Sequence, residues 1–200
     1  MVENQIRRRG ISDELVLDAM RRVPREAFVP HEHVSAAYAD CALPIGHGAT
    51  ISQPYIVASM TQALRVTPGT RILEVGTGSG YQAAVLAACG CAVFSVERVQ
   101  ALHERAAEVL RATGFGDVEL RLGDGSRGWA EQAPFDRILI TAAAPRLPPA
   151  LADQLAEGGL LVAPVGDDWM QVIRRYSKEA GVLRGEDIEG ARFVPLIEDP

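Results

Sequence analysis

A short apolar run leads directly into three alternating glycines, and this junction constrains the fold of the 200-residue chain more than any other feature. Residues 71–75 read Arg-Ile-Leu-Glu-Val, and Gly76, Gly78 and Gly80 follow at once, before an apolar segment at 80–89 that is suited to a helix. Glycine lets the backbone approach a ligand without a Cβ clash, and a helix N-terminus offers free N–H groups. The segment therefore predicts a strand, a tight turn and a helix that together bind a nucleotide-type ligand.

The spacing of the glycines distinguishes between two cofactor classes. Dinucleotide-binding turns follow G-x-G-x-x-G, whereas this chain has G-x-G-x-G and places Tyr81 where the third glycine would stand. Glu74, just before the turn, suits the cationic amino-acid end of S-adenosylmethionine better than it suits a pyrophosphate. Glu97 closes the next expected strand, about twenty residues further on, where a carboxylate reaches ribose hydroxyls. The pattern favours S-adenosylmethionine as the cofactor.

Strand and helix patterns alternate from residue 70 onward. The expected strands are 71–75, 92–97, 117–122, 135–141 and 159–165, and the expected helices are 80–89, 98–112 and 148–156. Such alternation predicts an α/β fold with a doubly wound, mostly parallel sheet. Two further strands, Met170–Tyr176 and Ala191–Leu196, are expected to pair antiparallel across a polar loop.

The N-terminal part has a different pattern. One amphipathic helix is expected at Ser12–Arg22 and another helix at Tyr55–Leu64, and the stretch between residues 30 and 54 reads as a loop long enough to be functional. We expect a single domain over residues 1–200. Its parts are an N-terminal helix and active-site loop (1–64), a cofactor-binding core (65–176), and a C-terminal strand and tail (177–200).

In an open parallel sheet the ligand lies beyond the carboxyl ends of the strands, and this rule selects the candidate residues. They are Glu74 with the glycine turn, Glu97, Asp124 with Gly125, and Thr141. An adenine amino group is one partner for Asp124, and an ordinary Asp-Gly turn is the alternative.

Composition narrows the classes of partner. The net charge of −6 and the isoelectric point near 5.3 argue against nucleic-acid binding. Because the chain has no run of eighteen apolar residues and no signal-peptide stretch, we expect no membrane partner and a cytoplasmic location. His31 and His33 have no third ligand nearby, so no metal site is predicted.

Several segments carry a more specific pattern, and in order they are Met20–Pro30, Thr50–Ala58, Leu73–Gln82, Val96–Arg98, Gly123–Gly125 and Phe193–Leu196. Together they resemble the protein-L-isoaspartate(D-aspartate) O-methyltransferase family over nearly the whole chain. The glycine turn is shared with many methyltransferases, whereas Thr-Ile-Ser-Gln-Pro at residues 50–54 is specific to this family.

The resemblance implies a class I S-adenosylmethionine-dependent methyltransferase with a Rossmann-like fold. Its activity would be transfer of a methyl group to the free carboxylate of L-isoaspartyl or D-aspartyl residues in damaged peptides and proteins. The ester would then close to a succinimide, which water reopens partly to normal aspartate. We expect such an enzyme to act as a monomer.

The resemblance also implies roles for individual residues. Ser52, with Thr50 nearby, is the expected catalytic residue and would orient the acceptor by hydrogen bonding; the alternative for Ser52 is a helix N-cap. The expected cofactor-binding residues are Glu74, Gly76, Thr77, Gly78, Gly80, Glu97, Arg98, Asp124, Gly125 and Thr141.

One position departs from the usual bacterial pattern of the family. Many bacterial members have glutamine directly before Thr50, whereas this chain has Ala49. Two alternative functions stay open: methylation of aspartate in a dedicated peptide substrate, and non-catalytic binding of S-adenosylmethionine.

Overall fold

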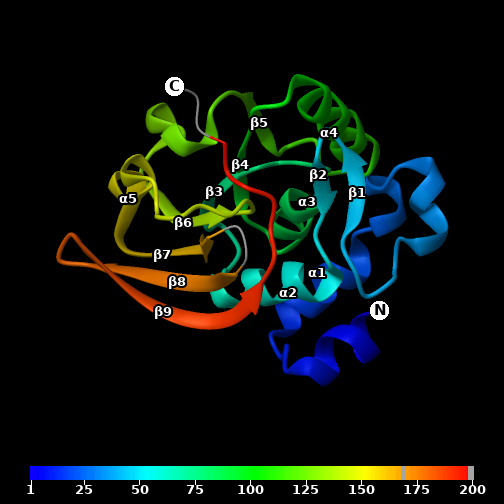
Figure 1. The fold of residues 1–200 in the computed structure, drawn as a ribbon, viewed down its shortest axis with the longest axis horizontal. Helices are drawn as coiled ribbons and strands as arrows, with labels where there is room; N and C mark the ends of the chain where they lie inside the picture. The colour runs from blue at the N-terminus through cyan, green and yellow to red at the C-terminus, as the bar shows by residue number, and fades with distance from the viewer. Residues whose placement is uncertain (168–169, 198–200) are drawn as a thin grey trace.

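The computed structural model, which describes residues 1–167 and 170–197, is built around a seven-stranded sheet (Figure 1). In spatial order the strands are β5 (Glu119–Leu122), β4 (Ala92–Glu97), β3 (Arg71–Val75), β6 (Phe135–Ile140), β7 (Leu155–Gly166), β8 (Gln171–Glu179) and β9 (Val182–Ala191). The first five run parallel to one another, and β8 and β9 continue the sheet antiparallel. The expected α/β fold with a mostly parallel sheet is confirmed.

Each face of the sheet has its own apolar core, because successive side chains of a strand point to opposite faces. On one face Ile72 and Val93 join a cluster that includes residues of four helices: α1 (Glu14–Arg22), α2 (Pro54–Ala63), α3 (Tyr81–Ala88) and α4 (Gln100–Ala112). On the other face Leu73 and Phe94 join a cluster that includes α5 (Pro149–Gln154). Glu74 alternates with Leu73 along β3 and so belongs to the face of the four helices.

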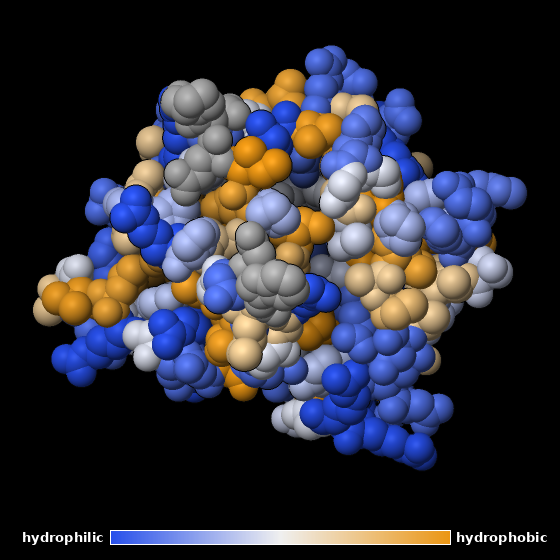
Figure 2. Space-filling view, viewed as in Figure 1, coloured by the Kyte–Doolittle hydropathy of each residue, from blue (hydrophilic) through white to orange (hydrophobic). Residues whose placement is uncertain are grey.

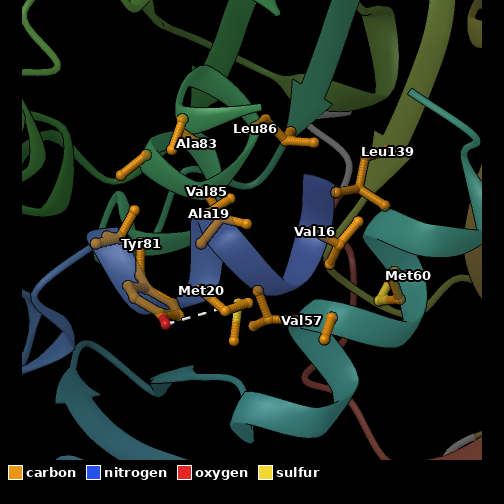
Figure 3. Packing of buried hydrophobic residues seen from close by; sticks show 14 of the residues in the cluster. Val16, Ala19, Met20, Val57, Met60, Tyr81, Ala83, Val85, Leu86 and Leu139 are labelled. Atoms are coloured by element: carbon orange, nitrogen blue, oxygen red, sulfur yellow. Dashed lines mark hydrogen bonds between the residues drawn. The ribbon is translucent and has the colours of Figure 1, made fainter. Parts of the chain in front are cut away.

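The packing between α1, α2 and α3 anchors the N-terminal part of the chain to the sheet. Figure 3 shows Met20 of α1, Val57 of α2 and Tyr81 of α3 in contact within one cluster. The Tyr81 hydroxyl lies 3.8 Å from the Met20 sulfur and donates to it. The N-terminal part therefore shares one hydrophobic cluster with the α/β part of the chain.

The stretch expected as a loop between residues 30 and 54 contains an antiparallel hairpin of β1 (Leu43–Gly46) and β2 (Ala49–Ile51). Its turn has positive φ at Gly46 (92°), His47 (54°) and Gly48 (72°). The short helices before it are η1 (Val2–Ile6), η2 (Arg7–Arg9), η3 (Arg25–Phe28) and η4 (His31–Ala36), and two more, η5 (Gly125–Arg127) and η6 (Ala130–Gln132), follow β5.

The last expected strand was placed wrongly. The structure forms β9 from Val182–Ala191, much of which the sequence suggested to be a polar loop, and only Ala191 belongs to both segments. β9 is an edge strand and all of its residues are exposed or half-buried, so it lacks the alternating apolar pattern that identifies a strand. Residues 192–197 instead run back over the sheet edge, where Ala143 N–H donates to the Val194 carbonyl (2.8 Å) and Leu196 N–H donates to the Ala143 carbonyl (2.6 Å).

Several element boundaries also differ from expectation. β7 begins at Leu155 rather than at residue 159, directly after α5 ends. The helix expected from Ser12 begins at Glu14, because the Asp13 side chain accepts from the Leu15 and Val16 N–H groups and so forms the N-cap.

In the part of the chain that the structure describes, no helix is both long and apolar enough to cross a membrane.

Candidate active site

A pocket of about 370 Å³ lies at the edge of the sheet where the parallel strands end. Its walls come from the glycine turn after β3, the end of β4, the loop after β6, the β1–β2 hairpin and the tail after β9. Figure 2 shows apolar side chains gathered around the middle of this face and hydrophilic side chains toward its rim. A mostly apolar pocket with a few polar groups is typical of a small-molecule site.

The glycine turn has the backbone shape that its sequence predicts. Gly76, Gly78 and Gly80 have φ angles of 97°, 54° and 84°, a region in which a side chain is strained. The N–H groups of Thr77 and Ser79 make no hydrogen bond to any residue that the structure describes. Both residues line the pocket, and so the turn can offer these donors to a ligand.

Glu97 closes β4 and joins the turn to the next helix. Its two carboxylate oxygens accept from the Gly78 N–H (2.8 Å) and the Val99 N–H (2.9 Å). The side chain is 6% exposed and lines the pocket. Each carboxylate oxygen can accept a second hydrogen bond, so Glu97 can also bind ligand hydroxyls.

Glu74 does not line the pocket, contrary to its expected position beside the ligand. It is fully buried, and it lies behind the turn: Ser95 bonds to its Oε2 atom, and the Ser95 hydroxyl also bonds to Thr77 Oγ1 (2.6 Å). Burial, reinforced by the nearby Glu97, raises the pKa of Glu74 to about 8 against the opposing effect of the Ser95 hydrogen bond. Glu74 therefore supports Thr77, which does line the pocket, and a direct ligand contact stays a prediction.

The β1–β2 hairpin and the residue after it bring the two expected catalytic hydroxyls to the same pocket. Thr50 and Ser52 line the pocket, together with Ala49. The N-cap of α2 is Gln53 and it makes no side-chain cap hydrogen bond, so the N-cap alternative for Ser52 is not supported. The Ser52 carbonyl accepts from Arg25 Nη2 at 2.7 Å.

The remaining expected residues divide between the pocket and its surroundings. Arg98, Gly125 and Thr141 line it, and the Thr141 hydroxyl donates to the carbonyls of Val75 (2.9 Å) or Gly76 (2.7 Å). Gly125 leaves no room for a side chain, because a Cβ there would lie 2.5 Å from the Val75 side chain.

Gly80 and Asp124 do not line the pocket. A Cβ on Gly80 would lie 3.3 Å from Leu110 of α4, so this glycine serves helix packing. Asp124 accepts from the Ser126 N–H (2.9 Å) and hydroxyl (2.7 Å). These bonds agree with the alternative in which Asp124 serves an ordinary Asp-Gly turn. Its contact with adenine stays a prediction.

One wall of the pocket is not predicted by the sequence. Residues 194–197 line it, whereas the sequence suggests a paired strand up to Leu196 and no role for Ile197. Val57 and Met60 of α2 also contribute apolar lining. The signal was present in the apolar Phe-Val-Pro-Leu segment, whose proline disfavours a paired central strand. Among the described residues, no group of three or more His, Cys, Asp or Glu side chains is placed to hold a metal ion.

Comparisons with known proteins converge on one family. The sequence model of the family Protein-L-isoaspartate(D-aspartate) O-methyltransferase matches residues 1–199. A protein-L-isoaspartate O-methyltransferase of Desulfosudis oleivorans is 52% identical over 197 residues, which cover 98% of this chain and 89% of that protein. One of Synechococcus sp. is 57% identical over 204 residues, covering 98% and 84%.

Solved structures agree with the sequence comparisons. A protein-L-isoaspartate O-methyltransferase structure superimposes with a TM-score of 0.89 at 29% identity, covering 98% of this chain and 65% of that chain. A Plasmodium falciparum protein described as a protein-L-isoaspartate O-methyltransferase, solved in complex with S-adenosyl-L-homocysteine, gives a TM-score of 0.86 at 28% identity. That match covers 99% of this chain and 97% of the other.

Replacing Glu97 by alanine should weaken binding of S-adenosylhomocysteine by about 1.5–3 kcal/mol, because a charge-assisted hydrogen bond to the ligand is lost together with the bond that holds Gly78. Isothermal titration calorimetry measures this change. Glu104→Ala, an exposed substitution on α4, is the control and should leave the affinity as it is. An unchanged affinity of the Glu97 variant would remove Glu97 from the cofactor site.

The buried carboxyl of Glu74 should make stability depend on pH. Because the pKa of Glu74 is about 8 in the folded protein and 4.5 as the reference value, its contribution to stability is fully present below pH 4.5 and is lost as pH rises through 8. Glu74→Gln should therefore lose less stability than the wild type between pH 5 and pH 8. Urea unfolding at several pH values tests this, with exposed Glu119→Gln as control; parallel pH profiles for wild type and Glu74→Gln would contradict it.

Proposed function

The chain belongs to the protein-L-isoaspartate(D-aspartate) O-methyltransferase family, and we propose that its pocket transfers a methyl group from S-adenosylmethionine to the free carboxylate of L-isoaspartyl and D-aspartyl residues in peptides and proteins. One observation carries the proposal: the hairpin hydroxyls of Thr50 and Ser52 and the glycine turn with Glu97 line the same cavity.

The donor set of the pocket fits an adenosyl cofactor with an amino-acid end. Glu97 would hold the ribose hydroxyls, and the N–H groups of Thr77 and Ser79 would bind acceptors on the cofactor. Thr141, Arg98 and Gly125 line the same wall, and Asp124 holds the turn after β5 next to Gly125. When bound, the cofactor supplies an electrophilic methyl group on a sulfonium.

The acceptor needs orientation rather than activation. A carboxylate is already ionised at neutral pH, so no general base is required, and no covalent enzyme intermediate is needed. The Ser52 hydroxyl can donate a hydrogen bond to one carboxylate oxygen and leave the other directed at the methyl group. The apolar residues Val57 and Met60 help to exclude water, which would otherwise compete for the same position.

Repair follows from the chemistry of the product. A methyl ester can expel methoxide, whereas a carboxylate would have to expel oxide. The neighbouring backbone amide nitrogen therefore attacks the ester carbonyl and closes a succinimide ring, and its proton leaves with the methoxide as methanol. Water then opens the succinimide at either carbonyl, and one of the two products is a normal aspartyl linkage. The enzyme itself is required only for the methyl transfer.

The placement of the two walls favours this function over the alternatives. A module that only binds the cofactor has no use for additional hydroxyls in the cavity of the glycine turn, and Thr50 and Ser52 provide two. The N-terminal segment (1–64) and the core (65–176) each provide pocket residues, which supports the proposal that they act as one catalytic unit with the tail. The negative net charge supports the absence of a nucleic-acid partner, and we further propose that the protein acts as a cytoplasmic monomer.

Ser52→Ala should lower kcat/KM for an isoaspartyl peptide by about tenfold to a thousandfold, because one positioning hydrogen bond is lost. The affinity for S-adenosylhomocysteine should stay close to that of the wild type. A methyl-ester release assay and calorimetry measure the two quantities, and the same peptide in its aspartyl form is the control acceptor. Intact activity with lost cofactor affinity would mean that Ser52 binds the cofactor instead.

Ala49→Gln should change kcat/KM by less than about tenfold, or 1.4 kcal/mol. Ala49 is half-buried in β2 and lines the pocket beside Thr50 and Ser52. We expect both hydroxyl-bearing residues to keep their positions when glutamine replaces it. The measurement compares wild type and variant on one isoaspartyl peptide. A wild type that is inert until glutamine is introduced would argue for a dedicated substrate or a binding role.

A further inference from the structure

A fully buried arginine, outside the pocket lining, bonds to the backbone at the end of the β1–β2 hairpin. Arg25, in η3, has no exposed surface and does not line the pocket. Its Nε donates to the Ala37 carbonyl at 2.8 Å, and its Nη2 donates to the Ser52 carbonyl at 2.7 Å. One guanidinium therefore joins the end of η4 to the exit of the hairpin.

The same guanidinium contacts the other wall of the pocket. The Arg25 Cζ atom lies 4.7 Å from the centroid of the Tyr81 ring, a cation–π contact. Tyr81 is the first residue of α3, directly after the glycine turn, and it lines the pocket. The Phe28 ring packs edge-on against it at 5.6 Å, and Figure 3 shows Tyr81 within the core between α1 and α3. Arg25 thus lies between the hairpin and the cofactor turn.

Stability alone is a weak reason for a cation in this place. Burial lowers the pKa of Arg25, and in the part of the chain that the structure describes no carboxylate forms an ion pair with it. An apolar side chain of similar length would fill the site without the cost of desolvating a charge. The planar fork of arginine does what such a side chain cannot, because it can bond two carbonyls at fixed angles while its face lies on a ring.

We propose that Arg25 is a positioning residue for the methyl transfer: it fixes the backbone at Ser52 so that the hairpin hydroxyls face the cofactor turn. The inference rests on the proposed function and extends it to a residue that touches neither reactant. The Ser52 carbonyl belongs to the residue whose hydroxyl orients the acceptor, so a shift of this carbonyl displaces the hydroxyl as well. A displacement of about 1 Å in a reacting geometry can cost a hundredfold in rate.

Arg137 provides a matched control. The Arg137 Nε atom also donates to a backbone carbonyl, that of Leu64, at 2.6 Å. Unlike Arg25, Arg137 bonds to no described residue whose hydroxyl lines the pocket. The variants are Arg25→Lys and Arg25→Gln, each compared with the same substitution at Arg137. The kinetic constants are measured per S-adenosylhomocysteine-binding site, counted by calorimetry, so that loss of folded protein does not count as loss of rate.

Both Arg25 variants should lose about tenfold to a hundredfold in kcat per binding site, with an S-adenosylhomocysteine affinity within about threefold of the wild type. Both Arg137 variants should keep kcat. In a double-mutant cycle, Arg25→Lys should cost less than about threefold once Ser52 is alanine, because the hydroxyl that it positions is gone. If the double variant lost kcat by the product of the two single losses, Arg25 would not act through Ser52, and the proposal would be overturned.

Hydrogen exchange gives a readout that does not depend on activity. The backbone amides of residues 50–53 should exchange faster in Arg25→Lys than in the wild type, and Arg137→Lys should not change them. Unchanged exchange together with unchanged kcat per site would overturn the role of Arg25. A wild type that does not methylate isoaspartyl peptides would instead refute the proposed function, and the exchange experiment would still decide whether Arg25 fixes the hairpin.

Discussion

Parallel hydrogen bonding of β3 to both of its neighbours is the constraint on which the site depends. Val75 is paired with Val96 on one side and with Ile140 on the other. The pairing continues beyond the strand ends, where Gly76 N–H donates to the Val96 carbonyl (2.9 Å) and Thr141 N–H donates to the Val75 carbonyl (3.0 Å). Three loops therefore leave the sheet at one level. The backbone register of the strands alone therefore determines where this end of the pocket lies.

The sequence predicted most of the central sheet and the glycine turn, because buried parallel strands give apolar runs and the turn requires glycine. Other parts left no such signal. The β1–β2 hairpin depends on positive φ at three successive residues, including His47, and the tail is held by backbone hydrogen bonds to Ala143. Backbone bonds of this kind do not depend on side-chain type, and hydrophobic periodicity cannot reveal them.

The sequence predicted where the site residues lie in the fold more reliably than it predicted which way their side chains point. Every expected residue lies at the sheet edge or in the hairpin, and Thr50, Ser52 and Glu97 do line the pocket. Glu74 lies near the end of β3 and Asp124 in the turn after β5, as expected, but their carboxyl groups bond to Ser95 and Ser126. Topology places a residue at the end of a strand. Whether its side chain then points outward depends on the strand's alternation and on the nearest donor, which the sequence does not show.

The polar character of β9, which disguised it as a loop, has a consequence for how the protein behaves at high concentration. Among residues 1–167 and 170–197, no strand pairs with the outer row of backbone N–H and C=O groups of β9, and such an edge can recruit a strand from another molecule. Its Glu186 and Asp187 side chains pair with Arg175 and Arg174 of β8 and remain exposed. A strand that added to this edge would have to remove water from these charged side chains. The residues that obscure the strand in the sequence are thus of the charged kind that makes strand addition at an exposed edge unfavourable.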